Sequence, residues 1–300
     1  MQRFGHYFPG EPVGVRFNPG QGCGGHIKTN VGGKSSAFGV WHEYVDEVQE
    51  IADRFNIKIV RIHTHIGSGN DSSVWEEAVQ LSLDVVRRFP GVTILNLGGG
   101  FKVDRLSFTP SNLQQIGTVV SAKIKEFADE TGRKLHLEIE PGTYITALGG
   151  VLLSTVQDLI TTGADGHTFV KLDSGMSEIL RPTMYDALHP FKVISRGDST
   201  TNEKQKYSIV GHCCESGDLI SLRDSDDQLI PVELDTIAID DLFLVGGAGA
   251  YCSSMCAKNY NSFPEVPEVL IRSSGEAVLI RKKQTVEQIV QNELSLPDLA

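Results

Sequence analysis

The chain has 300 residues, of which 40% are hydrophobic and 22% are charged, and its formal net charge is −11. This hydrophobic content supports a buried core and excludes a disordered protein, while the acidic excess argues against a nucleic-acid-binding surface. No apolar run approaches the roughly 18 residues needed to span a bilayer, which argues against a membrane protein.

The first half of the chain alternates between strand and helix patterns. Short apolar runs predict strands at residues 13–17, 57–62, 92–97 and 135–139. Apolar residues three or four positions apart predict helices that begin near Val45, Val74 and Leu113. This alternation predicts an α/β fold in which residues 1–148 form four strands of a TIM-type β/α barrel with helical crossovers.

The second half, residues 149–300, has a different texture. Short apolar runs are separated by Gly, Asp and Ser, which predicts a mostly antiparallel β domain. The predicted strands cover residues 151–160, 167–172, 191–195, 207–210, 219–222 and 229–234, and an amphipathic helix is predicted at 285–294. The five cysteines lie in a long chain with no apolar leader, so we expect reduced thiols and a cytoplasmic enzyme.

Three predicted strands of the first half run directly into distinctive motifs: HTHIGSG with His65, the triplet Gly98–Gly100, and Glu140-Pro-Gly142. Active sites of β/α barrels lie at the carboxyl ends of the strands. Each motif alone has an ordinary structural interpretation: a tight turn, a buried histidine, a surface carboxylate. Together, a glycine-rich phosphate cradle, a histidine for a planar ring and a carboxylate for a ring nitrogen point to pyridoxal phosphate.

The second half carries matching groups. Arg181 and Tyr185 offer a guanidinium fork and a phenol suited to a substrate carboxylate. Cys214 and Glu215 place a thiol beside acids, and a glycine-rich run leads to Tyr251, which we expect to open a helix. The alternatives are a surface ion pair, an inert packed thiol and a core tyrosine. We expect no metal site, because no companion pair completes a tetrahedral set around Cys252 and Cys256.

These motifs make the sequence similar to the fold-type-III, alanine-racemase-like decarboxylases that depend on pyridoxal phosphate, and most similar to their diaminopimelate decarboxylase branch. The matching segments occur in the family's order and span almost the whole chain: VGVRFNPG, HTHIGSG, LNLGGG, EPG, DSGMSEILRPTMYDALHP, CCESGD and GAYCSSMCAKNYNSFPEVPEVLI.

The resemblance implies a role for each singled-out residue. The cofactor would be held by His65 and Ser68 at the ring, Gly98, Gly99 and Gly100 at the phosphate, Glu140 at the ring nitrogen, and by Gly142 and Tyr251. Arg181 and Tyr185 would bind the distal end of an amino-acid substrate, Glu215 would read its distal amino group, and Cys214 would be the catalytic proton donor. In the family the partner subunit contributes Cys214 and Glu215, which implies a homodimer with shared active sites.

Two departures from the family pattern matter. Thr143 stands where the family motif EPGR has arginine, which leaves open a decarboxylase acting on lysine or ornithine instead of the two-carboxylate diaminopimelate. The family's cofactor-binding lysine lies in a YAxKAN-like strand upstream of every segment matched here. We therefore expect a fragment, incomplete for catalysis as this chain of 300 residues. A non-catalytic homologue that pairs with an active subunit is a third hypothesis.

Overall fold

The computed structural model describes residues 1–22, 30–65, 67, 69, 71–197 and 203–295. The chain folds into two compact units, Met1–Thr146 and Ala147–Ala300, which are described separately below. The sequence pattern places its boundary two residues later, between 148 and 149. No helix within the described ranges is long and apolar enough to cross a bilayer.

The first unit is built on a parallel sheet of five strands in the order β2-β1-β3-β4-β7. The four predicted strands are confirmed as β1 (Pro12–Asn18), β3 (Lys58–His63), β4 (Ile94–Asn96) and β7 (His136–Glu138). The fifth strand, β2 (Val40–Trp41), was not predicted, because two residues are too few for a recognisable pattern. A separate small hairpin joins β5 (Val103–Asp104) and β6 (Thr109–Pro110).

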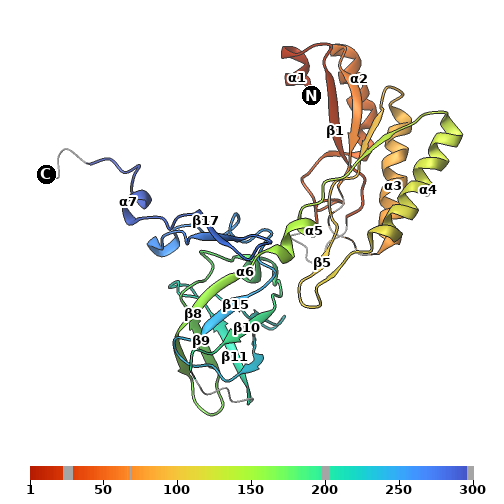
Figure 1. Ribbon diagram of the computed structural model, residues 1–300. Coiled ribbons are helices and arrows are strands. Elements are labelled where there is room, and N and C mark those ends of the chain that lie inside the picture. The colour runs from red at the N-terminus through yellow and green to blue at the C-terminus, as the bar shows by residue number, and fades with distance from the viewer. Residues whose placement is uncertain (23–29, 66, 68, 70, 198–202, 296–300) are drawn as a thin grey trace. The chain divides into compact units, whose positions relative to one another are not determined.

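The three predicted crossover helices are also confirmed. They are α2 (Val45–Phe55), α3 (Ser72–Arg88) and α4 (Leu113–Thr131), and α3 and α4 lie side by side (Figure 1). The carboxylate of Asp71 caps α3, and the side chain of Asn112 caps α4 by accepting a hydrogen bond from the Gln115 amide. The short elements α1 (Gln2–Tyr7), η2 (His42–Tyr44) and α5 (Thr143–Thr146) complete the helices of the first unit, and η3 (Ala147–Gly149) begins the second unit.

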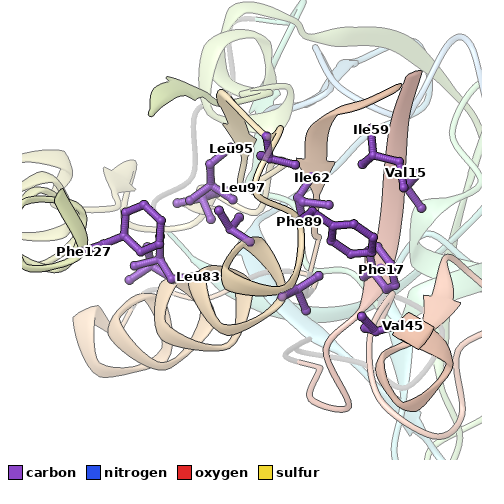
Figure 2. Close-up of a cluster of buried hydrophobic side chains, with 14 of the residues drawn as sticks. Val15, Phe17, Val45, Ile59, Ile62, Leu83, Phe89, Leu95, Leu97 and Phe127 are labelled. Carbon is purple, nitrogen blue, oxygen red and sulfur yellow. The ribbon is translucent and has the colours of Figure 1, made fainter. Parts of the chain in front are cut away.

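The core of the first unit lies between the sheet and these helices. Phe17 from β1 and Phe89 from the end of α3 pack with ring centroids 5.8 Å apart, and Ile62, Leu83 and Leu95 are equally buried (Figure 2). Full burial of such side chains stabilises the fold by about 1.5–3 kcal/mol each. This packing fixes the strand register, so that His63, Asn96 and Glu138 are paired neighbours on adjacent strands.

The second unit contains a six-stranded sheet in the order β10-β15-β8-β9-β11-β14. Its strands are β8 (Leu152–Thr161), β9 (Thr168–Leu172), β10 (Phe191–Ile194), β11 (Lys204–Val210), β14 (Val232–Asp235) and β15 (Leu242–Val245). All neighbours are antiparallel except β9 and β11, which run parallel, so the prediction of a mostly antiparallel sheet is confirmed.

Some predicted elements of the second unit differ from the structure. Pro231 has no amide hydrogen for the ladder, so the strand predicted over 229–234 is broken into β13 (Leu229–Ile230) and β14. Of residues 219–222, only Leu222 belongs to a strand, β12 (Leu222–Arg223), whereas Leu219 makes a single bridge to Val210. The hairpin of β16 (Glu268–Ile271) and β17 (Ala277–Arg281) was not predicted.

The helices of the second unit are short. The element α6 (Arg181–Tyr185) begins with Arg181 and Pro182, a proline position that costs no hydrogen bond. The C-terminal helix α7 (Val286–Ile289) is shorter than the predicted range 285–294 and is capped by a reciprocal pair of hydrogen bonds between Thr285 and Gln288. One irregular turn, η4 (Tyr260–Ser262), lies between these helices in the chain.

Candidate cofactor and substrate site

The carboxyl ends of β3, β4 and β7 bring three predicted motifs together in the first unit. The Glu140 amide donates a hydrogen bond of 2.8 Å to the Gly98 carbonyl oxygen. A Cβ atom on Gly99 would lie 2.6 Å from the Glu140 carbonyl oxygen and 3.8 Å from His65 Cε1. His65, the glycine triplet and Glu140 therefore form one cluster, as their positions after successive strands predict.

The glycine triplet is required by close contacts and by backbone conformation. Gly98 has a φ of +69°, and a Cβ atom there would lie 2.8 Å from both His65 Cβ and the Thr64 carbonyl oxygen. The Gly99 amide has no hydrogen-bond acceptor among the described residues. A free amide in a turn that excludes side chains is the kind of donor that a phosphate oxygen uses.

His65 is a neutral histidine. Burial, with the nearby charges of Arg16 and His63, lowers the pKa of His65 to about 4. Its Nδ1 atom is buried and has no hydrogen-bond partner within the described part of the chain. An uncharged imidazole held against the glycine turn is suited to pack on the face of an aromatic ring.

The lowered pKa predicts a loss of stability in acid. The unfolded chain binds a proton at His65 below pH 6.5, whereas the folded chain does so only near pH 4, so stability falls as the pH drops between these values. Between pH 7.5 and pH 5 this group is expected to remove about 2 kcal/mol of unfolding free energy. Urea unfolding followed by the fluorescence of Trp41 and Trp75 measures the loss. The His65→Gln variant should lose less over the same interval; equal losses would contradict the assignment.

Glu140 is joined to the glycine turn by an asparagine that sequence reasoning missed. Asn96 Nδ2 donates hydrogen bonds of 3.0 Å to Glu140 Oε1 and 3.1 Å to Glu138 Oε2. Asn96 Oδ1 accepts a hydrogen bond of 2.7 Å from the Gly98 amide. The signal in the sequence was a polar residue inside the apolar strand LNL, directly before three glycines.

The Glu140 side chain is more exposed to solvent than the apolar run at residues 135–139 predicts. β7 is an edge strand, and Leu137 and Ile139 are exposed. The Glu140 side chain is 52% exposed, and its Oε2 atom lies 3.9 Å from His63 Nε2. Burial lowers the pKa of His63, so this contact joins a carboxylate to a neutral ring at pH 7. The carboxylate is thus held on one side and open on the other.

In the second unit, α6 presents the two predicted substrate-binding residues. The Arg181 guanidinium carbon lies 5.9 Å from the centroid of the Tyr185 ring. Burial lowers the pKa of Arg181, and its Nε atom has no hydrogen-bond partner within the described ranges. The Tyr185 hydroxyl donates to the sulfur of Met255 at 3.7 Å. A half-buried guanidinium whose buried Nε–H has no acceptor among the described residues suits a substrate carboxylate.

The loop that carries Cys214 and Glu215 is anchored by a buried carboxylate. Asp218 is 3% exposed and accepts hydrogen bonds from the amides of Met176 at 2.6 Å and Cys213 at 2.8 Å. The Thr183 hydroxyl donates a 2.7 Å hydrogen bond to the Gly217 carbonyl oxygen, which ties the loop to α6. The structure therefore holds the Cys214 loop beside the helix that bears Arg181.

Two residues that were not predicted hold the functional end of this loop. The Cys214 amide donates a 2.8 Å hydrogen bond to Asn261 Oδ1, while the Cys214 side chain is exposed. The Gly217 amide and the Tyr260 hydroxyl donate to Glu215 at 3.0 and 3.3 Å, and these bonds lower the pKa of Glu215. Glu215 is therefore ionised at neutral pH, as a group that binds an ammonium must be.

A buried polar network lies behind the loop. The Ser177 hydroxyl is 2.7 Å from both Glu178 Oε2 and His212 Nε2, and the His212 ring stacks on Phe263 with centroids 3.6 Å apart. Burial raises the pKa of Glu178 and lowers that of His212. Burial and the charge of Asp218 raise the pKa of Cys213 to about 11, so this thiol stays protonated and inert, unlike a reactive cysteine.

The remaining predicted residues have plainer surroundings. Tyr251 does not open a helix: it lies in a turn with a φ of +57°, and its side chain is 52% exposed. The helix prediction was wrong because the preceding glycines continue into turns. The Gly142 carbonyl oxygen accepts the first hydrogen bond of α5, from Ile145 at 3.0 Å. Ser68 lies outside the described residues.

Comparisons with known proteins agree with this geometry. Residues 1–147 match the family described as "Pyridoxal-dependent decarboxylase, pyridoxal binding domain", and residues 119–249 match "Pyridoxal-dependent decarboxylase, C-terminal sheet domain". A diaminopimelate decarboxylase of Escherichia coli K12 is 32% identical over 298 residues, covering 98% of this chain and 70% of that protein. The chain belongs to the pyridoxal-dependent decarboxylases.

Further relatives within the pyridoxal-dependent decarboxylases show the same extent of similarity. A diaminopimelate decarboxylase of Streptomyces coelicolor is 34% identical over 301 residues, covering 98% of this chain and 66% of that protein. A crystal structure of a diaminopimelate decarboxylase superposes with a TM-score of 0.87 at 31% identity, covering 98% of this chain and 69% of that chain. The chain thus spans about two thirds of the length of its relatives, and the predicted fold class, a partial β/α barrel followed by a β domain, is confirmed.

The residues of the first unit fit the cofactor of a pyridoxal-dependent decarboxylase. The Gly99 amide, which has no acceptor among the described residues, would suit its phosphate, and the neutral His65 ring and the exposed side of Glu140 would suit its ring face and ring nitrogen. None of the described lysines of this unit comes directly after a strand of its sheet. Lys58 begins β3 at the opposite end, and Lys102 comes two residues after the glycine turn.

Proposed function

We propose that the chain provides the C-terminal half of the pyridoxal-phosphate barrel, residues 1–148, and the β domain, residues 149–300, of a diaminopimelate decarboxylase. The reaction removes CO₂ from meso-2,6-diaminopimelate and gives L-lysine, a step of amino-acid biosynthesis. The observation that carries the proposal is the cluster of His65, the glycine triplet and Glu140 at adjacent strand ends, in a member of this family.

The proposed cofactor-binding residues divide by the part of pyridoxal phosphate that they hold. When bound, this cofactor supplies an electron sink for the charge left on carbon by CO₂ loss. Glu140 keeps a proton on the ring nitrogen, the neutral His65 covers the ring face, and the turn of Gly98, Gly99 and Gly100 holds the phosphate. The Gly98 amide is bonded to Asn96, so the Gly99 amide is the donor that we assign to the phosphate. Ser68, Gly142 and Tyr251 complete the proposed set.

The proposed substrate-binding residues belong to the second unit. Arg181 and Tyr185 bind the distal carboxylate, and the ionised Glu215 binds the distal ammonium. Cys214 donates the proton to the substrate carbon, which its exposed position allows. As in the family, Cys214 and Glu215 serve the partner subunit's site, so the active species is a homodimer, which we place in the cytoplasm.

A second candidate substrate class is a basic amino acid such as lysine or ornithine. Thr143 is the first residue of α5 and replaces the family arginine, so a bidentate contact to a carboxylate is lost. Such a contact is worth about 1.5–3 kcal/mol. Losing this contact weakens the binding of diaminopimelate more than the binding of a substrate without a second carboxylate.

The function is tested by adding the family segment that carries the cofactor-binding lysine. The chain is co-expressed with the N-terminal third of the Streptomyces coelicolor relative, and CO₂ release is measured with meso-diaminopimelate, lysine and ornithine. The proposal expects lysine to form from meso-diaminopimelate. Formation of the diamines from lysine or ornithine would favour the second candidate, and no release from any substrate would contradict both.

The same assay tests the role of position 143. Thr143→Arg is expected to raise the ratio of kcat/KM for meso-diaminopimelate over lysine by about tenfold or more, because it restores one charged hydrogen-bonding fork. The change Thr146→Arg, at the other end of α5, is the matched control and should leave the ratio unaltered. An unchanged ratio in Thr143→Arg would show that this position does not read the second carboxylate.

A further inference from the structure

Asn96 contacts both halves of the cofactor site assigned under the proposed function. Its oxygen accepts a hydrogen bond from the Gly98 amide, and its nitrogen donates to Glu140. We propose that Asn96 is a positioning residue, which holds the Glu140 carboxylate at a fixed place relative to the glycine turn. Glu140 and the glycine turn then bind the ring-nitrogen end and the phosphate end of one cofactor molecule at a fixed separation. The inference rests on the proposed function.

The orientation of the Asn96 amide is fixed by its neighbours. The Gly98 N–H is a donor, so the atom facing it must be the amide oxygen. The two hydrogens of the amide nitrogen are then left for Glu138 and Glu140, at 3.1 and 3.0 Å. A flipped amide would place its oxygen against two carboxylates. Asn96 is 6% exposed, so these bonds are shielded from water.

The amide is anchored from the far side as well. Glu138 forms an ion pair with Arg61 at 2.9 Å, which fixes the other acceptor of Asn96. The strand register pairs His63 with Asn96 and Asn96 with Glu138, so the amide lies on the central strand of three. A short hydrogen-bonded chain therefore runs from Arg61 through Glu138 and Asn96 to Glu140.

Other groups near Glu140 are less able to hold it. His63 lies 3.9 Å away, and its burial keeps it neutral at pH 7. Arg16 interacts with Glu140 through its charge, but its hydrogen bond goes to the Val31 carbonyl oxygen, and Arg61 is bonded to Glu138. Among the residues that the structure describes, Asn96 is the hydrogen-bond donor to the Glu140 carboxylate. Without the Asn96 amide, the half-exposed Glu140 side chain would be free to rotate.

Binding to the purified 300-residue chain tests the proposal with two probes. Pyridoxal phosphate has a ring nitrogen and a phosphate, whereas benzyl phosphate has the phosphate and no ring nitrogen. Asn96→Ala is expected to lower the affinity for pyridoxal phosphate about ten- to 100-fold, as measured by calorimetric titration. This is the range expected for the loss of one hydrogen bond to a charged group. The same substitution should lower the affinity for benzyl phosphate by less than about threefold. Asn112→Ala, which removes the cap of α4, is the control for a general loss of stability and should change neither affinity.

A double-mutant cycle separates positioning from a structural role. If Asn96 acts through the Glu140 carboxylate, Asn96→Ala should weaken pyridoxal phosphate by less than about threefold in a Glu140→Gln background. An equal loss for both probes, or a full loss in that background, would overturn the inference. Asn96→Ser, which keeps a hydroxyl beside Gly98, replaces the alanine variant if the latter does not fold. Failure of the unaltered chain to bind either probe would instead overturn the proposed function.

Discussion

Borohydride reduction of the 300-residue chain with pyridoxal phosphate is expected to leave no single lysine carrying a pyridoxyl group in stoichiometric yield. A lysine that holds the cofactor must reach the carboxyl ends of the strands, where His65 and Glu140 lie. Lys58 begins its strand at the other end, and Lys171 lies on β9 of the second unit. Peptide mapping by mass spectrometry measures the yield at each lysine.

Lys102 is the lysine that most needs testing in this experiment, because it follows the glycine turn by two residues. Random reaction of pyridoxal phosphate with exposed amines would spread over many lysines and would be unaffected by Lys102→Arg. One equivalent on Lys102, lost in Lys102→Arg, would refute the prediction and would give the chain a cofactor lysine of its own. The outcome therefore distinguishes an incomplete site from an unusual complete one.

Four strands of the first unit's sheet were predicted because each is marked in the sequence by a short apolar run. Their parallel arrangement follows from the alternation of strand and helix patterns. The two residues of β2 are too few to form an apolar run, and they form a strand because they pair with the carboxyl end of β1. In β16 and β17, apolar residues are exposed on both faces, so no alternation between buried and exposed positions marks the hairpin.

The candidate site was predicted where its residues stand directly after a strand, as His65 and Glu140 do. Asn96, Asp218 and Asn261 were missed because their function depends on partners far along the chain. Asn96 reaches Glu140 across 44 positions, and Asn261 reaches Cys214 across 47. Spacing within one sequence does not contain such pairings; they arise from strand register and loop packing.

Asp218→Ala is expected to lower the unfolding free energy of the second unit by about 3 kcal/mol or more. The carboxylate accepts two backbone hydrogen bonds in a buried place, and each bond to a charged acceptor is worth about 1.5–3 kcal/mol. A Cβ atom on Gly175 or Gly211 would lie 2.4 or 2.2 Å from Asp218 Oδ2, so the backbone closes around this group and an alanine leaves a gap. The amides of Met176 and Cys213 would lose their acceptor.

Urea unfolding followed by hydrogen exchange of peptides from the second unit measures this loss. Both tryptophans, Trp41 and Trp75, belong to the first unit, so their fluorescence is an internal reference that should not move. Asp226→Ala removes an exposed carboxylate from a nearby turn and should change stability by less than about 0.5 kcal/mol. A loss in Asp218→Ala no larger than in this control would mean that Asp218 does not anchor the loop. The position of Cys214 beside α6 would then depend on the Thr183 and Asn261 hydrogen bonds alone.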